Sequence, residues 1–215
     1  QVRQEEGRRN MMYQDVVRSR RSVRDFMPDV EIPKEELMAI IEEAMFAPNS
    51  TNLNSWRFLI VTEKEQKEAL YEVSMQQPAV KGAAAVIILL GDLTAYTVAN
   101  ADEISAKAVA QGTMTEEIRQ GINENVSWYY DVSEEQKREW LMLDQGLVAM
   151  QLMLSAKDRG YDTVAMSGFK TEAVRKLFNI EDHLVNGLII PIGKAQTPGF
   201  ETVRRDVSEV VTWLD

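Results

Sequence analysis

The sequence predicts an α+β fold, a three-layer sandwich in which helices flank a central mixed sheet. Helical and strand patterns alternate along the 215 residues without repeats or low-complexity linkers. Residues 83–90 are continuously apolar, which is typical of a central strand buried on both faces. Hydrophobic residues make up 45 % of the chain, so a sizeable core can form without disulfides.

The N-terminal part of this fold is predicted to be helical. We expect a flexible polar extension over residues 1–10 and a single domain over residues 11–215. A short helix runs to about Arg18, because the apolar residues at positions 12, 13, 16 and 17 share one helical face. Pro33 opens an amphipathic helix with apolar residues at positions 37, 40, 41, 44 and 45, and Pro48 ends it.

Two strands and a helix are expected next. Residues 56–61 are typical of a strand. Thr62 and Glu65 have the spacing of a capping box and predict a helix through about Val73. The apolar strand of residues 83–90 follows and stops at Gly91.

Residues 93–131 are polar but helical in pattern, and we expect breaks at Gly112 and Gly121. Ser133 and Gln136 are spaced to cap the start of a longer helix.

That long helix is predicted to run through Arg159, with Gly160 as its C-terminal stop. We expect its core-facing stripe to consist of Trp140, Leu143, Leu147, Met150 and Leu154.

The C-terminal quarter is predicted as a short strand (161–165), a short helix (171–178) and another strand (188–192). Residues 210–214 are β-prone and apolar at the end of the chain. A segment this apolar is not expected to lie free in solvent.

Composition excludes several classes of function. The net charge of −10 and the pI near 4.8 disfavour binding to nucleic acid or to an anionic membrane. Without cysteine there are no thiolate nucleophiles, disulfides or iron–sulfur clusters, and with His183 as the single histidine a metal site is not expected. We expect a soluble, cytoplasmic protein.

Catalytic motifs are also missing. The sequence has neither the Gly-x-Gly-x-x-Gly fingerprint nor a P-loop, and no nucleophile elbow accompanies His183. We therefore predict no catalytic side chain and expect an enzyme of this composition to take its reactivity from a cofactor.

Two segments carry the cofactor hypothesis. Residues 20–24, Arg-Arg-Ser-Val-Arg, offer guanidinium donors suited to phosphate oxygens, although such a run is often only a solvated turn. Residues 48–56, Pro-Asn-Ser-Thr-Asn-Leu-Asn-Ser-Trp, concentrate neutral donors and acceptors before a strand. An ordinary polar loop is the alternative for the second segment.

In this order, with an amphipathic helix between them, the two segments resemble the nitroreductase family of FMN flavoproteins. The resemblance continues through Gln76-Gln77-Pro78, the long helix, the Met166-Ser167-Gly168 turn and the late Arg204-Arg205 pair. It covers nearly the whole chain after about residue 11, and it implies that the C-terminal strand, residues 210–214, is exchanged between two subunits.

The resemblance implies a site for FMN in a groove between two subunits. Arg20, Ser22 and Arg24 are expected to hold its phosphate, ribityl chain and pyrimidine edge, and Ser167 and Gly168 to lie near N5. The remaining implied cofactor-binding residues are Arg21, Asn54, Gln76, Met166 and Arg204, with Pro48, Asn49, Ser50 and Asn52 arriving from the partner subunit.

The resemblance also implies a homodimer that passes electrons from NAD(P)H through FMN to a nitroaromatic, quinone or similar small acceptor by a ping-pong mechanism. An oxygen-using flavin-cleaving or dehalogenating enzyme, or a non-catalytic FMN-binding redox sensor, stays open as an alternative. Two departures from the family pattern bear on this. Ser167 stands where some relatives carry an acidic residue, and Thr202 where some carry a lysine.

Overall fold

The structure is a computed structural model of the chain, and it describes residues 12–214. The expected extension over residues 1–10 lies outside the described part. The helices and strands are α1 (Tyr13–Ser19), β1 (Asp25–Phe26), α2 (Lys34–Ala44), β2 (Trp56–Val61), α3 (Lys64–Val73), α4 (Pro78–Gly82), β3 (Ala85–Asp92), α5 (Val98–Ala110), α6 (Glu116–Tyr129), α7 (Glu134–Asp158), β4 (Asp162–Thr163), α8 (Thr171–Phe178), β5 (Leu184–Gly193) and β6 (Ala195–Thr197).

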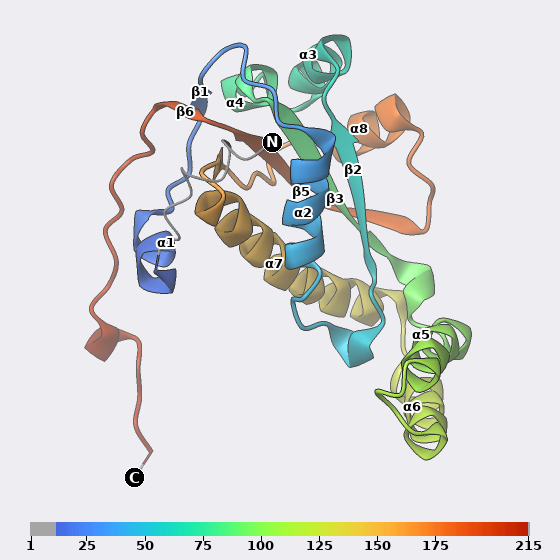
Figure 1. Cartoon of the computed structure of the whole chain (residues 1–215). Coiled ribbons are helices and arrows are strands. Elements are labelled where there is room, and N and C mark those ends of the chain that lie inside the picture. Colours follow the sequence, from blue (N-terminus) through green and yellow to red (C-terminus); the bar gives the residue numbers. More distant parts are fainter. Residues whose placement is uncertain (1–11, 215) are drawn as a thin grey trace, which may run out of the picture.

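The elements form three layers, which confirms the predicted α+β sandwich (Figure 1). A four-stranded sheet in the order β2-β3-β5-β4 is the middle layer. Its strands place alternate side chains in two separate apolar clusters, one with α2 and α7 and the other with α3, α4 and α8. The sheet is thus covered on both faces.

Strand β3 is the centre of this sheet, as its apolar sequence predicts. All eight of its residues are buried. The strand begins at Ala85 rather than residue 83, because the preceding residues 78–82 form α4. It continues past Gly91 to Asp92 because these residues still pair with Val185 and Leu184 of β5.

The sheet is antiparallel in the described part of the chain, and not mixed as expected. Strands β2 and β3, β3 and β5, and β4 and β5 each run in opposite directions. The parallel pairing found is an isolated bridge between Ser22 and Thr163, at the β4 edge.

Several local predictions are confirmed. Strand β2 and helix α8 have the predicted bounds. The Ser133 hydroxyl accepts a hydrogen bond from the Gln136 amide at 3.2 Å at the start of α7, and Gly160 ends that helix with φ of 81°. Such a left-handed conformation costs glycine little.

Two local predictions are wrong. The Thr62–Glu65 capping box does not form, because α3 begins after Glu63, which has no side-chain cap. Gly121 lies inside α6 instead of breaking it, whereas Gly112 does separate α5 from α6. A glycine inside a helix costs only about 1 kcal/mol, and packing of Val126 on the same helix offsets such a cost.

The core stripe predicted for α7 is also wrong. Leu143, Leu147 and Met150 are 67 %, 48 % and 39 % exposed. The face of α7 that packs on the sheet is lined instead by Leu141, Val148, Ala149, Leu152, Met153 and Ala156. Because α7 is apolar on two faces, residue spacing alone does not identify the one that meets the sheet.

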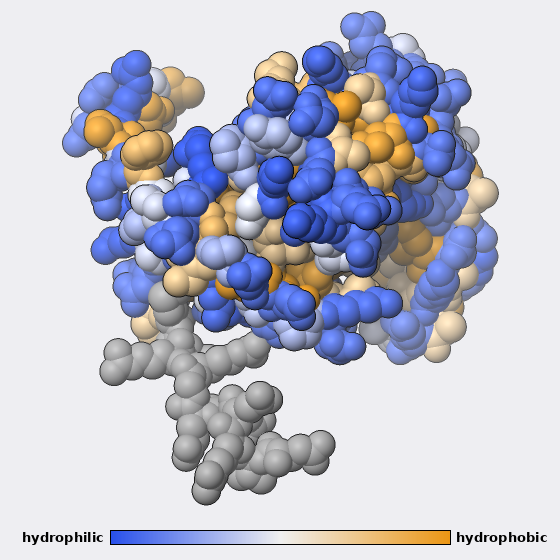
Figure 2. Space-filling model, turned by 90° about the horizontal axis from the view of Figure 1, so that it is seen from above, coloured by the Kyte–Doolittle hydropathy of each residue, from blue (hydrophilic) through white to orange (hydrophobic). Residues whose placement is uncertain are grey.

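The C-terminal tail forms no strand with its own chain. Residues 198–214 lie away from the layers (Figure 1), and the space-filling view shows them as an arm with apolar surface (Figure 2). Phe200, Val203, Trp213 and Leu214 are each at least 80 % exposed. A short 3-10 turn at Val207–Glu209 is the regular structure of this arm.

Candidate cofactor site

The arginine-rich turn lies at the β4 edge of the sheet. Helix α1 ends at Ser19, and the extended chain then passes beside β4, where the Val23 amide donates to the Thr163 carbonyl at 3.1 Å. Ser22 forms the parallel bridge to Thr163. The backbone pairing therefore fixes the position of the arginines on either side of Ser22.

Arg20 is surrounded by positive charge. Its pKa is lowered by burial, and further by the nearby guanidiniums of Arg204 and Arg21. Among residues 12–214, neither Arg20, Arg24 nor Arg204 has a carboxylate within ion-pair distance. An uncompensated group of guanidiniums fits an anion with several oxygens, such as a phosphate.

Arg21 has a different role from its neighbours. It donates to the carbonyl of Arg20 at 3.0 Å and pairs with Glu201 of the tail at 3.1 Å. The tail passes so close that a Cβ on Gly199 would lie 2.6 Å from the Cβ of Arg21. In this structure Arg21 fastens the beginning of the tail to the arginine turn.

The predicted N5 turn lies at the same edge. Met166 pairs with Ile189 of β5 through hydrogen bonds of 2.9 Å, and its side chain is buried in the core. The amides of Ser167 and Gly168 donate no hydrogen bond to any described residue. Two free N–H groups at the same sheet edge as the arginine turn can recognise the acceptor edge of a heterocycle.

Gln76 and Gln77 differ in where they point. The Gln77 amide donates to the Gly168 carbonyl at 2.8 Å and so braces the turn. Gln76, the residue predicted from the sequence, is exposed and bonds Glu72 at 3.1 Å. The sequence pattern therefore located the segment but not the residue that contacts the turn.

The Asn/Ser loop (residues 48–55) is held in an unusual shape. Thr51, Asn52 and Asn54 all have positive φ, between 48° and 56°. The Asn49 side chain accepts from the Asn54 amide at 2.9 Å and closes the loop on itself. Pro48 and Asn52 are exposed.

Within one chain the Asn/Ser loop and the arginine turn lie apart. The loop is bonded to Asp144 in the first half of α7, whereas α1, which leads into the turn, lines a cavity with Ser155 and Asp158 near the other end. At 1.5 Å per residue, Asp144 and Ser155 are separated by about 16 Å along the helix. The arginine turn, the tail and residues 166–168 come together, and the loop does not join them.

Comparison with known proteins assigns this chain to a family. The sequence profile of the nitroreductase family matches residues 17–194. The chain belongs to the nitroreductase family. YodC of Bacillus subtilis, provisionally named an NAD(P)H nitroreductase, is 38 % identical over 93 % of this chain and 98 % of that protein.

Two further relatives widen the comparison. The CLA biosynthesis enone reductase of Lactiplantibacillus plantarum is 31 % identical over 93 % of each chain. A nitroreductase, also provisionally named, from Exiguobacterium sibiricum, crystallised in complex with FMN, has a TM-score of 0.90 and 33 % identity over 95 % of this chain and 98 % of its own. The nitroreductase fold is thereby confirmed.

Sequence reasoning missed a buried carboxylate, Asp144, that binds the Asn/Ser loop. Asp144 is buried and accepts hydrogen bonds from Ser50, Ser55 and Tyr96. Burial raises the pKa of its carboxyl, and the bonds from Ser50 oppose that shift. The sequence did contain a signal, because an acidic residue in the apolar run Leu141-Met-Leu-Asp-Gln-Gly-Leu-Val is unusual for a core helix.

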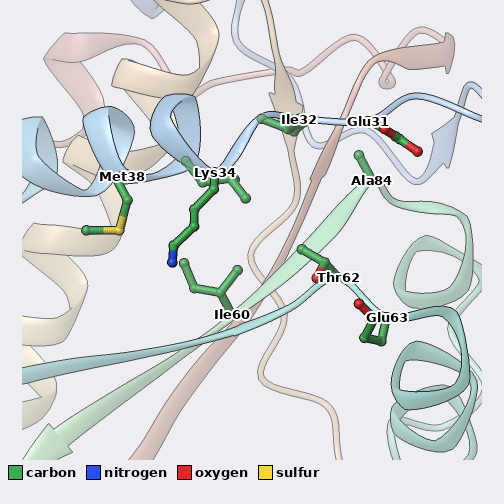
Figure 3. Close-up of a pocket in the computed structure, with 9 residues that line it drawn as sticks. Glu31, Ile32, Lys34, Met38, Ile60, Thr62, Glu63 and Ala84 are labelled. Atoms are coloured by element: carbon green, nitrogen blue, oxygen red, sulfur yellow. The ribbon is translucent and has the colours of Figure 1, made fainter.

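Two cavities lie away from the arginine turn. One of about 620 Å³ opens between the start of α2 and the end of β2, where Lys34, Met38 and Ile60 face it (Figure 3). Its lining includes none of the predicted site residues. The other, of about 500 Å³, lies beside the Asn/Ser loop, between Thr51 and an aromatic cluster of Trp128, Tyr129, Tyr130 and Trp140.

The aromatic cluster packs within the chain. Tyr129 stacks on Trp140 with centroids 5.3 Å apart, and the Tyr130 hydroxyl lies 2.7 Å from the Thr51 hydroxyl. The α5–α6 hairpin, which carries Trp128 and Tyr129 of this cluster, projects from the sandwich at the end of α7 nearest the loop (Figure 1). Trp128 remains 66 % exposed.

Proposed function

We propose that this chain binds FMN and transfers electrons from NAD(P)H to nitroaromatic, quinone or similar small acceptors. The observation that carries the proposal is the approach of Arg20 and Arg204, neither of which has a carboxylate partner among residues 12–214, at one edge of a nitroreductase fold. The FMN complex of the Exiguobacterium relative supports the choice of cofactor. A cytoplasmic location belongs to the same proposal, because NAD(P)H is available there.

Each part of the site has a task in this proposal. Arg20 and Arg204 bind the phosphate, and Arg24 together with the amides of Ser167 and Gly168 faces the polar edge of the ring. FMN, when bound, supplies the hydride-accepting chemistry. A guanidinium beside the pyrimidine edge stabilises negative charge that develops there, so the protein itself needs no side-chain acid or base.

A homodimer is part of the proposal. The Asn/Ser loop does not reach the arginine turn of its own chain, so the loop of the partner subunit would complete each site. The exposed apolar stripe of Leu143, Leu147 and Met150 gives α7 a face suited to a two-fold contact. The apolar tail gives each chain an arm that can cover the other and add a strand to it.

An enone is a second acceptor class with support among the relatives. The Lactiplantibacillus plantarum protein is named an enone reductase and matches 93 % of this chain. A carbon–carbon double bond next to a carbonyl accepts a hydride and a proton, as a quinone does. Assays of the acceptor should therefore include an enone beside a quinone and a nitroarene.

FMN binding is the first test. FMN added to cofactor-free protein should bind at close to one per subunit and raise the midpoint of thermal unfolding, because ligands of the native state stabilise it. FAD should bind more weakly, because its adenylate extends beyond a site that closes on a terminal phosphate. A protein that neither binds FMN nor gains thermal stability from it would contradict the proposal.

Steady-state kinetics test the electron transfer. With NAD(P)H and a quinone varied together, we expect parallel reciprocal plots, because both substrates use one open pocket in turn and the sequence has no separate dinucleotide motif. Intersecting plots would show a ternary complex and would exclude the ping-pong mechanism.

A further inference from the structure

One buried carboxylate holds both ends of the Asn/Ser loop. Asp144 of α7 is 4 % exposed. Its Oδ1 accepts from the Ser50 amide at 3.0 Å and the Ser50 hydroxyl at 3.1 Å. Its Oδ2 accepts from the Ser55 hydroxyl at 3.5 Å and the Tyr96 hydroxyl at 3.3 Å.

This carboxylate has no cationic partner among residues 12–214. Burying an unpaired charge is costly, and neutral donors offset only part of the cost. Leucine would fill a similar volume in an apolar helix without that penalty. We therefore expect Asp144 to serve the groups that it hydrogen-bonds, and not the packing of α7.

Those groups flank a strained segment. Thr51, Asn52 and Asn54, at φ of 48°, 56° and 49°, lie between the two anchored serines. Asparagine adopts the left-handed conformation more readily than other residues with a side chain, so the strain is greatest at the β-branched Thr51. Such a conformation persists where the surroundings determine it. The side-chain amide of Asn100 adds a third anchor by donating to the Leu53 carbonyl at 2.8 Å.

We propose that Asp144 is a positioning residue that fixes the Asn/Ser loop in the shape in which Asn52 meets the cofactor. It acts by accepting hydrogen bonds and does not touch the cofactor itself. The inference rests on the proposed function, in which the loop completes the FMN site of the partner subunit. Strain at the loop is then maintained by α7, a rigid element, before FMN arrives.

Three substitutions separate hydrogen bonding from charge and from general stability. Asp144→Leu keeps the volume and removes every acceptor. Asp144→Asn keeps one oxygen for Ser50, and its amide can donate to the hydroxyls of Ser55 and Tyr96, which can also accept. Leu152→Ala is the matched control, because it opens a cavity in the core face of the same helix without contacting the loop.

Hydrogen exchange of the amides of residues 51–54, measured in FMN-free protein, reports on the loop, and FMN titration well below the unfolding midpoint reports on the site. We expect Asp144→Leu to accelerate exchange and raise the Kd for FMN by about tenfold or more each, the effect of releasing one strained residue. Asp144→Asn should stay within about threefold of wild type in both. Leu152→Ala should lower the unfolding midpoint and leave both the exchange rate of the loop and the Kd for FMN unchanged.

The inference is overturned if Asp144→Leu keeps the wild-type exchange rate and the wild-type Kd for FMN. It is also overturned if Asp144→Asn changes the exchange rate and the Kd as much as Asp144→Leu does. Faster exchange with an unchanged Kd would also overturn it. Should Asp144→Leu not fold, the pair Ser55→Ala and Tyr96→Phe, which empties only Oδ2, takes its place. Wild-type protein that binds no FMN would contradict the proposed function instead, while exchange would still decide whether Asp144 holds the loop.

Discussion

At the scale of residues, neighbouring arginines in one short turn do different work. Arg21 bonds the backbone and the tail residue Glu201, and its side chain is largely covered. Arg20 has no carboxylate partner among residues 12–214, and its pKa is lowered by burial and by the nearby guanidiniums of Arg204 and Arg21. A side chain used for structure has its partners within the protein, whereas one used for binding keeps its donors free for a ligand. The sequence pattern does not distinguish them, because both are arginines in the same motif.

Arg20→Gln should therefore lower FMN affinity without destabilising the cofactor-free protein. A charge-assisted hydrogen bond is worth about 1.5–3 kcal/mol, so the Kd should rise by about one to two powers of ten. The repulsion from Arg204 is lost at the same time, so the unfolding midpoint without FMN should not fall. Arg18→Gln, the same charge change at an exposed position of α1, is the control and should leave both values near wild type. Equal Kd values for the two variants would remove Arg20 from the site.

At the scale of elements, helix α7 organises the molecule. Its inner face contacts the sheet through a buried amide, Gln145, whose two polar side-chain atoms have no hydrogen-bond partner. Two glycines on neighbouring strands make room for it. A Cβ on Gly187 would lie 1.5 Å from the Gln145 amide oxygen, and one on Gly91 would lie 2.4 Å from its nitrogen. The approach of α7 to β3 and β5 thus depends on the glycines.

Gly187→Ala should destabilise the cofactor-free protein by about 1–3 kcal/mol, the usual cost of overpacking. Adding Gln145→Ala removes the atoms in conflict and should recover most of the loss. Urea unfolding of the two single variants and the double variant measures this coupling, which we expect to exceed about 1 kcal/mol. Effects that simply add would show that helix and strand do not meet through these two residues.

Local signals in the sequence predicted much of the fold. The bounds of β2 and α8 and the cap of α7 at Ser133 follow from alternation, periodicity and capping chemistry. What failed depended on tertiary contacts. The core face of α7 cannot be identified from the sequence because two faces of the helix are apolar. The antiparallel order of the sheet cannot be predicted either, because strand direction is set by the connections and not by composition.

The candidate site was predictable in part. The Arg-Arg-Ser-x-Arg turn and residues 166–168 lie at one edge of the sheet, as expected of one site. Asp144 and Gln77 were missed, because each acts on a segment far away in sequence. Their roles follow only from contacts in the folded chain.

At the scale of the whole molecule, the two groups of residues that we propose to bind FMN lie apart within one chain. The arginine turn and tail lie near one end of α7, and the Asn/Ser loop and aromatic cluster near the other. The exposed stripe of α7 runs between them. In a two-fold dimer built on that stripe, the loop of each subunit can approach the arginines of the other.

The most direct test of the composite FMN site mixes two defective subunits. Arg24→Ala damages the arginine turn, Asn52→Ala damages the loop, and each homodimer should be inactive. In a mixed dimer one site carries both defects and the other carries neither, so co-expression should restore about half of the wild-type activity per mixed dimer. If confirmed mixed dimers show no rescue, each FMN site is built within a single chain and the account is contradicted.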